Sequence, residues 1–138
     1  MKKRTAVITL SLLLILVMIL SAPVFALKTA NATIAGVSCN ATLSRGTTSA
    51  TATTSCGGNP STCTVTLSLT YYYSSDDNHN GKIEDNEGHR ITQTASNGNL
   101  NSAYVNIVGQ GVNVSTISSS SSHSVYYSNQ SWSAALSE

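Results

Sequence analysis

One segment of twelve residues carries the side chains whose types and spacing could do chemistry. Residues 76–87 contain five of the six acidic residues of this 138-residue chain. Oxygen-bearing side chains stand at positions 1, 3, 5, 9 and 12 of the segment, and these are Asp76, Asn78, Asn80, Glu84 and Glu87. Carboxylate and amide oxygens are the ligands that hard divalent cations prefer in proteins. The segment is therefore the first candidate for a functional site.

The spacing resembles the calcium loop of EF-hand and dockerin proteins, over these twelve residues only. The resemblance implies one Ca²⁺ per chain. Gly81, at position 6, would permit the sharp turn, and Ile83, at position 8, would pack beneath the loop. The implied ligands are the side chains of Asp76, Asn78, Asn80 and Glu84, the backbone carbonyl of Lys82 and both carboxylate oxygens of Glu87.

The flanks of the segment depart from the EF-hand family. The preceding residues 64–73 alternate apolar and polar side chains and predict a strand instead of an entering helix. A calcium loop joining two strands is therefore expected, without the helix pair that opens in calcium sensors. The alternative interpretation is a solvated polar turn, because the residue types of Asp-Asn-His-Asn-Gly favour a turn without any bound ion.

Other constellations carry less information. A Ser-His-Asp triad can be drawn through His123, but no nucleophile motif accompanies it, so we predict no catalysis. His79, inside the acidic segment, and His89, just after it, could bind a transition metal, although exposed turn residues explain them as well. The aromatic residues around Tyr72 and Trp132 could form a glycan-binding or peptide-binding surface, or alternate members could fill the core; we favour the core.

The first residues have the layout of a secretory signal peptide. Lys2 to Arg4 are basic, an apolar run extends from Ala6 to Leu20, and Val24-Phe25-Ala26 provides a cleavage site. We expect residues 1–26 to be removed and the protein to be secreted or held at the surface of a bacterium. A retained membrane anchor is the alternative, but the run is shorter than the roughly 20 residues of a spanning helix.

The remaining residues 27–138 are one domain's worth of chain, and they carry few charges. This part contains four basic and six acidic residues, so the sequence predicts no basic patch that would bind nucleic acid or an anionic membrane. Cys39, Cys56 and Cys63 all lie in the exported part, where a disulfide is favoured. Cys39 and Cys56 are symmetric about a probable hairpin turn, and we favour this pair over Cys56–Cys63.

Alternating patterns separated by turn signals predict a small Ig-like antiparallel β-sandwich of about seven strands, preceded by the signal-peptide helix. The clearest strand is 65–73, and a weaker one is expected over 32–37. The five-serine run 118–122 is interpreted as a flexible loop or a polar strand edge. The closing segment 122–136 loosely resembles the last hairpin of small exported β-sandwich proteins of Gram-positive bacteria, which implies no activity.

These observations favour a secreted or cell-surface calcium-binding module with a structural or adhesive role and an unknown protein or glycan partner. Two alternatives are a secreted bacteriocin or toxin-like protein and, less favoured, a small exported hydrolase. A hydrolase needs a converging acid–base cluster, which the sequence does not display.

Overall fold

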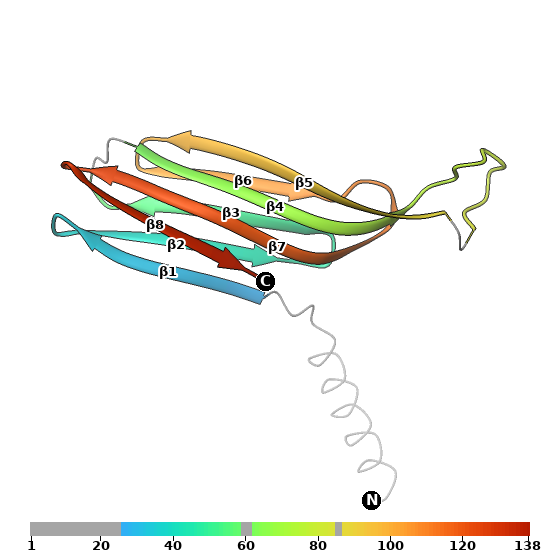
Figure 1. The fold of residues 1–138 in the computed structure, drawn as a ribbon, viewed down its shortest axis with the longest axis horizontal. Coiled ribbons are helices and arrows are strands. Elements are labelled where there is room, and N and C mark those ends of the chain that lie inside the picture. Colours follow the sequence, from blue (N-terminus) through green and yellow to red (C-terminus); the bar gives the residue numbers. More distant parts are fainter. Residues whose placement is uncertain (1–25, 59–61, 85–86) are drawn as a thin grey trace, which may run out of the picture.

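A computed structural model describes residues 26–58, 62–84 and 87–138. It contains eight strands in two antiparallel four-stranded sheets (Figure 1). The predicted antiparallel β-sandwich is confirmed, with eight strands where the sequence indicated about seven. The strands are β1 (Ala26–Ile34), β2 (Val37–Arg45), β3 (Ser49–Cys56), β4 (Thr62–Ser74), β5 (Gly88–Asn99), β6 (Ser102–Val108), β7 (Val112–Tyr127) and β8 (Gln130–Ser137).

The strand order is β1-β2-β3-β6 in one sheet and β5-β4-β7-β8 in the other. Consecutive strands within a sheet form hairpins, and the β3–β4, β5–β6 and β6–β7 connections cross between the sheets. The edge strands β1 and β8 lie at one seam of the sandwich, and the edge strands β5 and β6 lie at the other.

The core forms because the inner face of each strand is apolar at every second residue. In β4 the buried positions include Val65, Leu67, Leu69 and Tyr71, each no more than 1% exposed. The outer face of the same strand carries hydroxyl side chains that bond across to neighbouring strands, for example Thr70 Oγ1 to Thr92 Oγ1 at 2.8 Å. The alternation seen in the sequence therefore separates the core from a surface of small polar groups.

The cysteine prediction is confirmed. Cys39 and Cys56 stand directly opposite each other on β2 and β3 and form a disulfide with a Cα–Cα distance of 4.0 Å. Cys63 is fully buried and free, which excludes it from the alternative pair in this structure. Burial raises the pKa of the Cys63 thiol, because the core disfavours a thiolate.

Two expectations about strands are wrong. The strand expected over 32–37 is interrupted, because Ala35 and Gly36 take positive φ values of 47° and 79° and turn the chain from β1 into β2. The serine run 118–122 is neither a loop nor an edge. It lies inside β7, between β4 and β8, and Ser119 and Ser121 are buried there.

The predicted signal segment 1–26 lies outside the described residues except for Ala26, the first residue of β1. No helix among the described residues is long and apolar enough to cross a membrane. The acidic segment joins β4 to β5 and extends beyond the end of the sandwich (Figure 1).

Candidate functional site: the acidic loop

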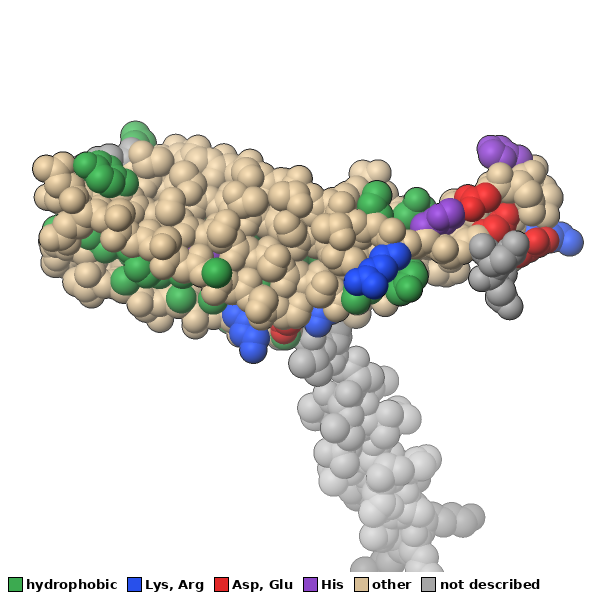
Figure 2. All heavy atoms as spheres, in the orientation of Figure 1, with side chains coloured by type: hydrophobic (Ala, Val, Ile, Leu, Met, Phe, Trp, Pro, Cys, Tyr) green, Lys and Arg blue, Asp and Glu red, His purple; other side chains and the backbone are tan. Residues whose placement is uncertain are grey.

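The acidic segment is held at its base by the β4–β5 hairpin. Ser74 and Gly88 are the last paired residues of the two strands, and the Ser75 amide donates to the Glu87 carbonyl at 3.2 Å. The expected loop between two strands is therefore present. In Figure 2 most of the acidic side chains gather at this end of the molecule, while the body of the sandwich shows a few separate Lys and Arg side chains.

The first half of the loop is organised by side-chain oxygens that accept from backbone amides. The two carboxylate oxygens of Asp76 accept from Asn80 N at 3.0 Å and from Gly81 N at 2.7 Å. The amide oxygen of Asn78 also accepts from Asn80 N, and that of Asn80 accepts from Lys82 N at 2.8 Å. The side chains at positions 1, 3 and 5 thus turn into the loop. Gly81 has φ +79°, a conformation that favours glycine.

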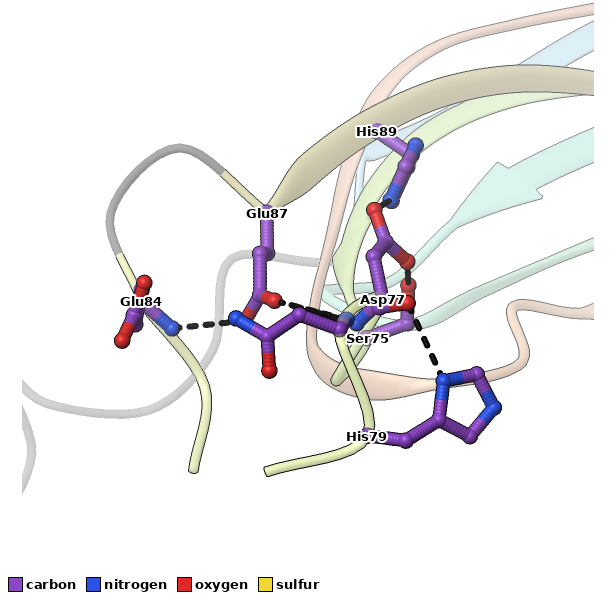
Figure 3. Close-up of polar contacts among 7 residues, drawn as sticks. Ser75, Asp77, His79, Glu84, Glu87 and His89 are labelled. Atoms are coloured by element: carbon purple, nitrogen blue, oxygen red, sulfur yellow. Dashed lines mark hydrogen bonds and ion pairs between the residues drawn. The ribbon is translucent and has the colours of Figure 1, made fainter. Parts of the chain in front are cut away.

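Glu87 accepts three backbone hydrogen bonds, more than any other described acid of the loop, and only 3% of it is exposed. Its Oε1 accepts from Asp77 N at 3.1 Å and from Asn78 N at 3.3 Å, and its Oε2 accepts from Glu84 N at 2.9 Å (Figure 3). No Lys or Arg forms an ion pair with this carboxylate in the described part of the chain. A buried carboxylate is costly without such partners, so the three amides account for its position.

The loop falls short of a complete calcium geometry in three respects. No three side chains of His, Cys, Asp or Glu converge as a metal cluster among the residues described. Glu84 is exposed, and its Oε1 accepts from the side-chain amide of Asn80 at 3.3 Å. Ile83, expected to pack beneath the loop, is instead 40% exposed. Asp85 and Asn86 lie outside the described residues.

A contact between Asp77 and His89 that the sequence analysis missed fastens the loop to β5. His89 Nε2 lies 2.7 Å from Asp77 Oδ2, and the His89 ring stacks on Tyr73 with a centroid distance of 5.1 Å. A hydrogen bond from Ser75 and the nearby His89 hold the pKa of Asp77 below its usual value. The strand register explains this contact. Tyr73 and His89 stand opposite each other on β4 and β5, which places the His89 ring at the base of the loop that contains Asp77.

His79 and His89 contact the same residue through different atoms. Both contact Asp77, but His79 uses Nδ1 to reach its backbone carbonyl at 3.0 Å, whereas His89 reaches the carboxylate. His79 has φ +57° in the turn, as expected for an exposed turn residue. The two rings therefore stabilise the base and the bend of the loop.

His123 lies in the core and not in a cleft, with 2% of its surface exposed. Thr54 Oγ1 donates to the Thr64 carbonyl at 2.7 Å, so it accepts from His123 Nδ1–H at 2.8 Å. Ser121 Oγ donates to His123 Nε2 at 2.7 Å. Both nitrogens of a neutral ring are thus satisfied, and burial lowers the pKa of His123. No carboxylate reaches this ring in the described structure.

The aromatic residues divide between core and surface. Tyr71 is buried, Tyr73, Tyr127 and Trp132 pack partly against the core, and Tyr72 and Tyr126 are about half exposed. The interpretation that alternate members fill the core is confirmed.

No family model matches this chain, and no curated protein or solved structure matches it.

Proposed function

We propose that the loop of residues 76–87 binds one Ca²⁺ and that the protein is a small secreted or cell-surface module with a structural or adhesive role. The observation that carries the proposal is the buried Glu87 carboxylate, held by the amides of Asp77, Asn78 and Glu84 with no basic partner among the described residues. This is the residue that the calcium pattern assigns as the bidentate ligand.

The donor set suits a hard cation, because every proposed ligand atom is an oxygen. The proposed ligands are the side chains of Asp76, Asn78, Asn80, Glu84 and Glu87 and the backbone carbonyl of Lys82. The side chains of Asp76, Asn78 and Asn80 are already turned inward by their bonds to backbone amides. Glu84 is the ligand that must move. It is exposed and held only by one long bond to Asn80, so a change of rotamer is inexpensive.

A bound cation would offset the repulsion among the acids of the loop. No Lys or Arg forms an ion pair with them among the described residues, and the His89 ring contacts only Asp77 among these acids. Because the loop extends beyond the sandwich, the ion would order a projecting segment and leave the core unaffected (Figure 1). A projecting loop of fixed shape is suited to contact a protein or glycan at a cell surface.

An extracellular location would suit this function. The disulfide between Cys39 and Cys56 persists in oxidising compartments, and millimolar extracellular calcium would occupy a site of affinity ~10⁻⁴ M. We propose secretion with cleavage after Ala26. Mass spectrometry of the secreted protein should then give a chain that begins at Leu27, and recovery of the intact chain in membranes would contradict cleavage.

Calorimetric titration tests the calcium proposal. The wild-type protein should show one site, and Glu87→Gln should weaken binding by at least tenfold, because one of the two clamping oxygens is replaced by an amide NH₂. Glu138→Gln is the matched control, since Glu138 is the one acid outside the loop. It should bind as the wild type does. A folded wild-type sample that gives no heat signal at millimolar Ca²⁺ contradicts the proposal.

A further inference from the structure

The seam between β1 and β8 exposes one free strand edge from each sheet. β1 is an edge of one sheet and β8 is an edge of the other, and the two lie near each other (Figure 1). No other strand of the described chain pairs with the outer side of either edge. Unpaired edges are templates for further strands, so natural proteins usually block them.

The hydrogen-bond alternation of β8 shows which amides are free. Ser119 and Glu138 exchange both backbone bonds, at 2.7 and 2.8 Å. In an antiparallel pair such residues alternate with residues whose amides point away from the neighbour. The register between β7 and β8 runs without a shift, so the N–H and C=O groups of Ser133 and Ala135 point to the open edge.

The usual devices that block an edge are absent from β8. Residues 130–137 contain no charged residue and no proline, and their pairing contains no bulge. Lys28 is the one charged residue of β1. Each seam is spanned by a side-chain hydrogen bond: Asn97 Nδ2 donates to the Tyr104 carbonyl at the β5–β6 seam, and Ala35 N donates to Gln130 Oε1 at the turn end of the β1–β8 seam. The rest of the β8 edge, from Ser131 to Ser137, has no such bridge among the described contacts.

The apolar side chains that face inward along this seam are incompletely covered. Trp132, Ala134 and Leu136 of β8 are each only partly buried, as are Ala30 and Ala32 of β1. On the neighbouring strand β7 the inward-facing Val125 is 1% exposed. In Figure 2 a row of hydrophobic side chains is visible along the lower side of the sandwich, where β1 and β8 meet.

We infer that this seam is an interface with a second copy of the chain, in which the β8 strands of the two copies pair antiparallel about a two-fold axis. A two-fold axis makes the pairing antiparallel, and it places the same uncharged β8 edge on both sides. With the axis at Ala134, the free amides of Ser133 and Ala135 meet those of the partner. Trp132 then faces Leu136 of the second copy, so the partly exposed apolar side chains cover each other.

A second copy fits this seam better than a single peptide strand does. The seam offers one edge in each sheet, and the two sheets of a sandwich lie about 10 Å apart. A partner that covers both must itself present two edges at that spacing. Another copy of the chain presents two such edges, because the two-fold axis that pairs the two β8 strands also brings the two β1 strands together.

Sedimentation equilibrium of the purified protein tests the inference, with Ala135→Pro as the variant and Ala135→Ser as its matched control. Proline removes an amide that points to the open edge and leaves the β7 ladder intact. The wild type and Ala135→Ser should have twice the monomer mass, and Ala135→Pro should be a monomer with a folded circular dichroism spectrum. A monomeric wild type, a dimeric Ala135→Pro, or assemblies larger than a dimer would overturn the inference.

A cysteine test is independent of how well the proline variant folds. Ala134→Cys places a thiol opposite its own copy across the axis, in a closely spaced pair. It should therefore give a disulfide-linked dimer on a non-reducing gel. Ser133→Cys, whose opposite residue is Ala135 of the second copy, should not. Equal cross-linking of the two variants, or none in either, would contradict this register.

Discussion

Replacing Glu87 by glutamine should loosen the acidic loop even without calcium. The Glu87 carboxylate accepts three backbone amides, and in the variant one oxygen becomes an NH₂ group that cannot accept. The Glu84 amide, bonded to Oε2, then loses its partner or forces the side chain to flip. A hydrogen bond to a charged group contributes about 1.5–3 kcal/mol. A loss of about 2 kcal/mol corresponds to roughly a 30-fold increase in local opening.

Amide hydrogen exchange in chelator measures this opening residue by residue. The amides of Asp77, Asn78 and Glu84 should exchange about 30-fold faster in Glu87→Gln than in the wild type. The amides of β4 and β7 should be unchanged, because the sandwich core does not include the loop. Glu84→Gln is the control, since that exposed carboxylate accepts only from the Asn80 side chain among the described residues. Unchanged exchange of the three loop amides in Glu87→Gln would refute the assignment of Glu87 as the organising residue.

Three further outcomes follow from the structure. The double variant Cys39→Ala, Cys56→Ala removes the disulfide, which links residues 17 apart in the sequence. The free energy of unfolding should fall by about 3 kcal/mol, and calorimetry should show a melting temperature lower by about 10 °C or more. Burial lowers the pKa of His123 in the folded protein, so as the pH falls the unfolded chain takes up a proton at a higher pH than the folded one. The free energy of unfolding, measured by urea denaturation, should therefore fall as the pH drops below about 6.5. A flat pH profile would contradict the buried neutral ring. Chelation of calcium should lower the melting temperature by several degrees, as for a loss of about 1 kcal/mol, and complete unfolding at room temperature would show that the ion is needed for folding.

The sequence predicts the two-layer fold because apolar and hydroxyl residues alternate strictly in strands such as β4. It also predicts the Cys39–Cys56 pair, because the turn after Arg45 sets the register of β2 against β3. The acidic loop was located from the spacing of its oxygens, and its position between two strands is confirmed.

The errors have physical causes. Ala35 adopts a positive φ in the turn between β1 and β2, and alanine gives no signal for such a conformation. The serine run hides the alternation of β7, since inner and outer positions carry the same residue type. Ser121 is buried at low cost because its hydroxyl donates a hydrogen bond to His123 Nε2. This bond exists only in the folded protein, so the sequence does not reveal it. The Asp77–His89 pair likewise depends on the register of β4 against β5.

The most direct test of the central claim is a crystal structure of the protein grown with millimolar Ca²⁺. The account predicts one ion in the loop, about 2.3–2.6 Å from six or seven oxygen atoms. Both carboxylate oxygens of Glu87 and the carbonyl of Lys82 should be among them, with Glu84 turned toward the ion. A well-ordered loop without an ion, or an ion bound elsewhere on the chain, would contradict it.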